Sequence, residues 1–214
     1  MPVVDDVTGS TGSPRTDGRA ALMLAARQEL ADHGPAGLSL RAVARRAGVS
    51  HAAPKHHFVD RAGLLTALAV EGFRLLSARF RAVEAAAPGS STDPLLAIGQ
   101  AYLDFSLAEP DLFEVMFGTE PLHADDPDLM AERRYTFTVL SSNVTGADPR
   151  DPSAYGRPVP VASLTAWAMI HGLVMITRDG SLQRITGTAT AEQTIELARG
   201  LAETFTAVLR RAEL

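Results

Sequence analysis

Residues 48–58 read GVSHAAPKHHF and combine a turn glycine with a serine, a lysine and three histidines. Such side chains can bind a metal ion, serve as a catalytic base or contact nucleic acid. A metal site is disfavoured because the adjacent His56 and His57 cannot share one face of a helix, and no carboxylate stands three or four residues after His51. Hydrogen bonds to phosphates or base edges are the chemistry that these groups support best.

The rest of the chain offers no catalytic motif. The sequence contains no glycine-rich phosphate loop, no HExxH and no GxSxG. It also contains no cysteine, which excludes disulfides, thiolate nucleophiles and thiolate metal ligands. We therefore expect a protein that is not an enzyme, with no metal site and no cofactor.

Charge is distributed unevenly along the chain. Residues 15–81 contain 11 Lys and Arg against 5 Asp and Glu, whereas residues 82–214 contain 9 against 18. A basic front segment on a chain of net charge −5 indicates a polyanionic partner for that segment alone, and chance surface charge is the alternative.

The elements that would position these groups are helices. Apolar residues recur at helical spacing, and no alternating run predicts a sheet. We expect an all-α protein of about nine helices, preceded by a disordered arm over residues 1–16. The predicted helices span residues 17–33, 39–47, 50–56, 60–87, 93–107, 110–117, 128–144, 160–178 and 191–212.

Helix ends are marked by specific residues. Ser39, Ser50 and Asp60 are the expected N-caps of the second, third and fourth helices. Gly48 is expected to end the second helix with a positive φ. The longest apolar run, residues 161–176, is shorter than the ~20 residues that cross a bilayer. We therefore expect a cytoplasmic protein without membrane association.

Helices 39–47 and 50–56, joined by a tight glycine turn, predict a helix-turn-helix. The second helix would enter the major groove of double-stranded DNA, where Ala52 and Ala53 are small enough to let the backbone approach the bases. The candidate DNA contacts are Ser39, Arg41, Ser50, His51, Ala52, Ala53, Lys55, His56 and His57.

The segment GLSLRAVARRAGVSHAAPKHHFVDRAGLL resembles the DNA-binding segment of TetR-type transcriptional regulators, and the resemblance covers about residues 19–68. It implies that Phe58 locks the motif onto the core and that Arg61, at the start of the fourth helix, contacts phosphate. Lys55 departs from the family, which usually has a phosphate-binding tyrosine there. Lysine keeps the phosphate contact but loses the aromatic packing.

The C-terminal half carries Trp167, His171 and Gly172 in AWAMIHGLV, and this pattern resembles the WHG-type ligand-binding and dimerisation domain of a subgroup of these regulators. Residues 109–118, EPDLFEVMFG, resemble the same subgroup. An apolar pocket with aromatic and methionine side chains suits a lipophilic small molecule. The candidate ligand contacts are Tyr102, Phe105, Met116, Phe117, Phe137, Trp167, Met169 and His171.

Helix 160–178 is apolar nearly all round, and helix 191–212 has a wide apolar stripe, which together favour a homodimer joined by a four-helix bundle. The candidate interface residues are Leu173, Thr177, Leu201, Phe205 and Val208. We expect residues 17–60 to bind DNA and residues 61–214 to bind the ligand and the partner subunit.

These expectations describe a dimeric regulator, and the family resemblance implies that it is a repressor. It would bind a near-palindromic operator and be released by a small-molecule inducer. A helical enzyme or carrier without DNA binding is the alternative from another class. Two further alternatives also bind DNA: an activator, and a nucleoid-type DNA-binding protein without a ligand.

Overall fold

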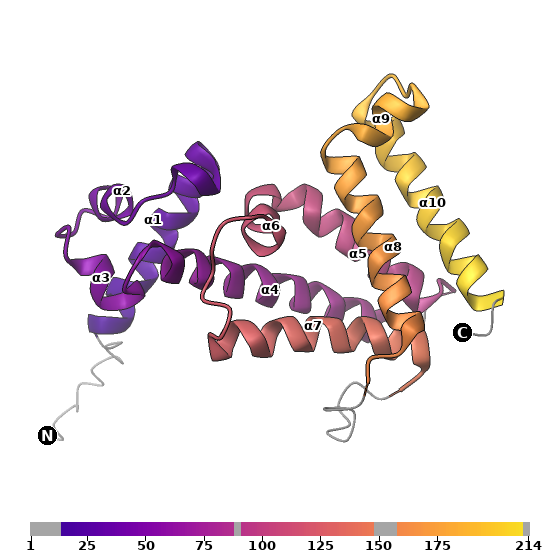
Figure 1. Cartoon of the computed structure of the whole chain (residues 1–214), viewed down its shortest axis with the longest axis horizontal. Coiled ribbons are helices and arrows are strands. Elements are labelled where there is room, and N and C mark those ends of the chain that lie inside the picture. Colours follow the sequence, from indigo (N-terminus) through magenta and orange to yellow (C-terminus); the bar gives the residue numbers. More distant parts are fainter. Residues whose placement is uncertain (1–13, 88–90, 148–157, 212–214) are drawn as a thin grey trace, which may run out of the picture. The chain divides into compact units, whose positions relative to one another are not determined.

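The structure, a computed structural model, describes residues 14–87, 91–147 and 158–211. Within these ranges the chain forms ten helices and no strand, which confirms the predicted all-α class (Figure 1). Residues 1–13 of the expected arm lie outside the described part, and Pro14 already belongs to the first helix. Contacts divide the chain into unit 1, residues 1–68 with 120–122, and unit 2, residues 69–119 with 123–214.

Unit 1 contains α1 (Pro14–Gly37), α2 (Leu40–Arg46), α3 (Ala53–Phe58) and the first two turns of α4 (Arg61–Ala86). The chain leaves helical geometry at Gly34, whose φ of 66° and ψ of 177° suit the predicted helix stop. The core is made by the apolar faces of the four helices, and its buried members include Leu22, Ala26, Leu30, Val43, Phe58, Leu64 and Leu65.

Two predicted N-caps of unit 1 are confirmed. The Ala42 amide donates to Ser39 Oγ at 3.2 Å, and the Gly63 amide donates to Asp60 Oδ1 at 2.7 Å. Each bond satisfies one of the amides that a helix start leaves without an intrahelical partner. The predicted positive φ of Gly48 is confirmed at 68°.

Unit 2 contains the rest of α4 and six further helices: α5 (Pro94–Ala108), α6 (Pro110–Phe117), α7 (Pro127–Thr145), α8 (Val161–Arg178), α9 (Ser181–Thr186) and α10 (Ala191–Arg211). Helix α8 packs against α5, α7 and α10. By length and composition, α8 is the one helix of the described chain that meets the requirements of a membrane span. Its buried Ser163, bonded to Ser141 Oγ at 2.8 Å, is nevertheless satisfied by α7.

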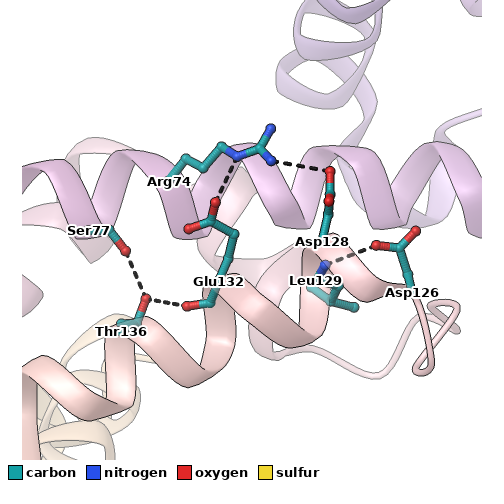
Figure 2. A network of polar contacts seen from close by, with 7 residues as sticks. All are labelled: Arg74, Ser77, Asp126, Asp128, Leu129, Glu132 and Thr136. Atoms are coloured by element: carbon teal, nitrogen blue, oxygen red, sulfur yellow. Dashed lines mark hydrogen bonds and ion pairs between the residues drawn. The ribbon is translucent and has the colours of Figure 1, made fainter. Parts of the chain in front are cut away.

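A polar network holds α7 against the part of α4 that belongs to unit 2 (Figure 2). Ser77 Oγ and Thr136 Oγ1 lie 3.0 Å apart in the buried layer between the two helices. At the surface, Arg74 donates to Glu132 at 2.8 Å and to Asp128 at 3.2 Å. Asp126 caps α7 by accepting from the Leu129 amide at 2.9 Å. These bonds fix which face of α7 points into unit 2.

Candidate DNA-binding and ligand-binding sites

The turn between α2 and α3 is longer than the sequence predicted. Helix α3 begins at Ala53, and its N-cap, Ala52, makes no side-chain capping bond. The predicted helix start at Ser50, with Ser50 as its cap, is therefore wrong. Pro54 explains the difference because its ring fits the first turn of a helix, where no amide bond is lost. Ser50 instead closes the turn through its carbonyl oxygen, which accepts from the Ala53 amide at 3.0 Å.

Most candidate DNA contacts lie at the surface of unit 1. Seven of them are exposed: Ser39, Arg41, Ser50, His51, Ala52, Lys55 and His56. Ala53 and His57 are half-buried, and Pro54 and Phe58, between the exposed side chains, are buried. The guanidinium of Arg19 lies 5.6 Å from the centre of the Phe58 ring. The motif thus presents its polar side chains to solvent while Phe58 anchors it in the core, as the family resemblance implied.

Arg61 is bound to acceptors within unit 1. Its guanidinium donates to the carbonyl of Leu38 at 2.9 Å, to the carbonyl of Pro35 at 2.6 Å and to Glu120 at 2.7 Å. The bonds to the two carbonyls tie the start of α4 to the last turn of α1 and to the residue that follows α1. The three bonds together use at least three of the five N–H groups of the guanidinium. The predicted phosphate contact of Arg61 depends on the remaining donors and stays a prediction.

Arg46, the last residue of α2, also has acceptors within unit 1. It donates to the buried Glu29 and to Asp32, both at 2.6 Å. The hydrogen bond to Glu29, and then that to Asp32, raise the pKa of Arg46. Arg46 therefore holds α2 on α1 although it is exposed, as are the other two cations of α2, Arg41 and Arg45.

Unit 2 contains a cavity of about 310 Å³. Five of the eight candidate ligand contacts line it, namely Tyr102, Met116, Phe117, Phe137 and Trp167. The remaining lining consists of Phe73, Phe80, Arg133, Thr136, Leu140 and Ile170. Aromatic and aliphatic side chains thus make up most of the wall, and the cavity size is at the lower end of the roughly 300–1,000 Å³ typical of small-molecule sites.

The structure does not bring the other three candidates to the cavity wall. Phe105 is fully buried, with the Arg79 guanidinium 5.5 Å from its ring centre. Met169 is 50% exposed, because two residues after Trp167 a helical side chain points to a different face. His171 lies behind the wall, where its ring stacks on Trp167 with centroids 5.1 Å apart.

Tyr102 and His171 form a hydrogen-bonded pair, with the phenol oxygen 2.8 Å from Nδ1. Burial raises the pKa of Tyr102 and lowers the pKa of His171. The phenol is therefore protonated and the imidazole neutral, and the direction of the hydrogen bond follows the tautomer of His171. The pair therefore adds no charge to the wall of the cavity.

The sequence did not single out Arg133 and Thr136, although a signal for them exists. Arg133, Thr136, Phe137 and Leu140 follow the i, i+3, i+4, i+7 spacing of one helical face, and all four line the cavity. The arginine breaks the apolar pattern of this stripe, so only Phe137 was selected. Phe73 and Phe80 of α4 also line the cavity, and neither was among the candidate ligand contacts.

A second hollow of about 620 Å³ lies along α8 and α10. Four of the five candidate interface residues line it: Leu173, Leu201, Phe205 and Val208. Thr177 does not, and its hydroxyl donates to the Leu173 carbonyl at 2.7 Å. A Cβ added to Gly172 meets no atom within 4 Å. The apolar face of α8 and α10 is thus open to solvent in a single chain.

Two family models match the chain. The model described as "Bacterial regulatory proteins, tetR family" matches residues 22–68, and "Tetracyclin repressor-like, C-terminal domain" matches residues 95–201. Among curated proteins, the HTH-type transcriptional regulators Mb1846 of Mycobacterium bovis and Rv1816 of Mycobacterium tuberculosis are each 31% identical over 125 residues, 58% of this chain and 53% of theirs. The chain spans about half the length of these relatives.

Solved structures have the same fold. A protein with unknown function from Rhodococcus sp. RHA1 matches with a TM-score of 0.65 at 30% identity, over 92% of this chain and 97% of that one. The TetR-like regulator LfrR from Mycobacterium smegmatis, in complex with proflavine, matches with a TM-score of 0.54 at 20% identity, over 89% and 97%. The second match concerns the fold alone. Together with the two family models, these similarities establish that the chain belongs to the TetR family of transcriptional regulators.

Proposed function

We propose that the chain is a cytoplasmic repressor that binds a near-palindromic DNA operator as a homodimer and is released by a small lipophilic molecule. The observation that carries this proposal is the exposed polar face of the helix-turn-helix, with Arg41, His51, Lys55 and His56 in solvent. Lys55 and His56 follow one another in α3, the helix that would enter the major groove. Residues 17–60 would bind DNA, and residues 61–214 the ligand and the partner.

The open apolar face of α8 and α10 supports the homodimer. Val208 is 59% exposed and Leu201 is 40% exposed, although both are large apolar residues of the apolar stripe of α10. Covering such a face with its own copy, across a two-fold axis, removes the apolar surface from water. A symmetric dimer presents two identical DNA-binding motifs, so its operator would be an inverted repeat.

The cavity supports control by a ligand. Helix α4 is continuous from Arg61, in unit 1, to Phe73 and Phe80, which line the cavity in unit 2. A ligand that binds one conformer of α4 better than another shifts the population of the two conformers. In this proposal, the ligand favours the conformer whose two DNA-binding motifs do not fit the operator spacing.

A gel shift with DNA from upstream of the gene tests the proposal. We expect a sequence-selective complex whose affinity falls by about a thousandfold or more between about 50 and 200 mM salt, because phosphate contacts release counterions. Unrelated DNA of equal length is the control. A helical enzyme or carrier would give no selective complex at any salt concentration, and that result would reject the proposal.

A further inference from the structure

Arg133 is the one side chain of the cavity wall that carries a full charge. Its guanidinium lies 5.7 Å from the centre of the Phe73 ring, which is also part of the wall. Within the described residues, it has no hydrogen bond or ion pair with a protein acceptor. The planar donor groups of this arginine are thus held beside an apolar space without an anionic partner.

The two carboxylates of α7, Asp128 and Glu132, pair with a different arginine, Arg74 (Figure 2). Glu132, which directly precedes Arg133, accepts from Arg74 at 2.8 Å, and Asp128 accepts from Arg74 at 3.2 Å. The lining of the cavity contains no Asp or Glu. The helix therefore directs its acids toward Arg74 on the surface and leaves Arg133 on the cavity face with Thr136 and Phe137.

A half-buried guanidinium loses part of its hydration, and an anion restores that loss through charge-assisted hydrogen bonds. A single arginine matches a single negative charge, and a carboxylate fits its fork of donors in a bidentate manner. The other lining groups are apolar apart from the hydroxyls of Tyr102 and Thr136. Both hydroxyls already have partners, Tyr102 with His171 and Thr136 with Ser77. The wall thus provides for one anionic group on an otherwise hydrophobic body.

We infer that the ligand is a compact hydrophobic monocarboxylate. Its carboxylate pairs with Arg133, and its apolar part lies among the aromatic side chains near Trp167. This inference rests on the proposed function of the cavity as the ligand site. The volume of about 310 Å³, at the lower end of the range of small-molecule sites, suits a small molecule of this kind.

A set of three matched probes tests the inference: 4-phenylbutyrate, 4-phenylbutan-1-ol and 4-phenylbutylamine share one hydrophobic body and differ in head-group charge. Trp167 is the single tryptophan of the chain and lines the cavity, so its fluorescence reports occupancy directly. We expect the acid to bind about 10- to 100-fold more tightly than the alcohol, because a hydrogen-bonded charged pair contributes that much affinity. The amine should bind most weakly.

Substitutions of Arg133 assign the effect to one residue. Arg133→Gln should remove the 10- to 100-fold preference for the acid over the alcohol. Arg133→Lys, which keeps the charge, should retain part of the preference. Arg134→Gln is the matched control, because Arg134 is an exposed neighbour on α7 that is absent from the cavity wall. Circular dichroism establishes that each variant is folded.

The possible results separate two failures. If the alcohol binds as tightly as the acid, if the amine binds most tightly, or if Arg133→Gln and Arg133→Lys both keep the preference of the wild type, the carboxylate inference is wrong and the cavity remains a ligand site. If none of the three probes changes the fluorescence of Trp167, the cavity itself is not the ligand site, and the proposed function loses its inducer pocket as well.

Discussion

Individual basic residues of unit 1 divide into those that face solvent and those that hold the motif together. A charge count identifies the basic segment, but it cannot show that Arg46 is paired with Glu29 or that Arg61 binds the carbonyls of Pro35 and Leu38. These partners come from other parts of the chain, so the sequence spacing within one helix does not reveal them. Lys55, in contrast, was predicted to contact DNA from its place in the motif, and it is exposed.

Lys55→Ala should weaken binding to all DNA sequences to a similar extent, because a phosphate contact carries no sequence information. We expect the slope of log affinity against log salt concentration to fall by about one, as the loss of one phosphate contact requires. Fluorescence anisotropy with an operator duplex and an unrelated duplex measures both quantities. Arg134→Ala, in unit 2, is the control, and a changed sequence preference in Lys55→Ala would show that Lys55 contacts a base instead.

His171 gives the protein a pH-dependent stability. Burial lowers the pKa of His171 from the usual 6.5. As the pH falls below 6.5, His171 is therefore protonated in the unfolded chain while it is still neutral in the folded chain. The free energy of unfolding should therefore fall with pH, by at most about 1.4 kcal/mol per pH unit for this one group. The loss begins as the pH falls through 6.5 and ends at the lowered pKa.

His171→Asn isolates this contribution, because an asparagine amide can accept the Tyr102 hydroxyl but does not titrate. We expect the difference in free energy of unfolding between about pH 7.5 and about pH 5.5 to be smaller in the variant than in the wild type. Urea denaturation at the two pH values measures it. An equal pH dependence in both proteins would mean that His171 takes up its proton equally easily in the folded chain.

At the scale of elements, helix ends were predictable where a residue type determines them and not elsewhere. Pro110 opens α6, Ser39 caps α2 and Asp60 caps α4, and each boundary was predicted within a residue or two. The predicted start of α3 at Ser50 was wrong, although serine is a good N-cap. The helix begins at Ala53 because Pro54 takes its place in the first turn. Helix α9 was missed because six residues between Gly180 and Gly187 are too few for a periodic pattern.

The glycine turn of the helix-turn-helix gives a prediction for Gly48. Its φ of 68° is costly for a residue with a Cβ, while an added Cβ would meet no atom within 4 Å. Gly48→Ala should therefore lower the free energy of unfolding by about 1 to 2 kcal/mol through the backbone alone, and weaken DNA binding by misplacing α3.

Gly200→Ala is the matched control, because Gly200 lies inside α10 and an added Cβ is equally unobstructed there. In helical geometry the same change should raise the free energy of unfolding by about 0.5 to 1 kcal/mol. Denaturation followed by circular dichroism compares the two variants. A destabilisation by both, or by neither, would contradict the assigned backbone conformation of Gly48.

At the scale of the whole molecule, the fold class and the family of both matched regions were predictable because local patterns determine them. The helix-turn-helix has turn and cap residues, and the C-terminal domain has the Trp167, His171 and Gly172 pattern. The cavity wall was predictable only in part, because Phe73 of α4, Arg133 of α7 and Trp167 of α8 converge through tertiary packing. The spacing within one helix identifies the apolar face of that helix, but it does not identify the helix against which that face packs.

The proposed homodimer predicts that Val208→Glu separates the subunits. A carboxylate at this apolar face would be buried without a partner, which should raise the dimer dissociation constant by about 100-fold or more. Ile185→Glu is the control, because Ile185 is 78% exposed on α9 and does not line the hollow of α8 and α10. Sedimentation velocity distinguishes monomer from dimer, and a dimeric Val208→Glu would place the interface on another face.

The most direct test of the central claim is an in vitro selection of bound duplexes from a random DNA pool by the full chain. We predict that the enriched sequence is an inverted repeat whose half-sites lie about one helical turn apart, or a multiple of it, with two chains bound per duplex. Enrichment of a single asymmetric site by one chain, or no enrichment at all at low salt, would contradict the assignment of this chain as a dimeric operator-binding regulator.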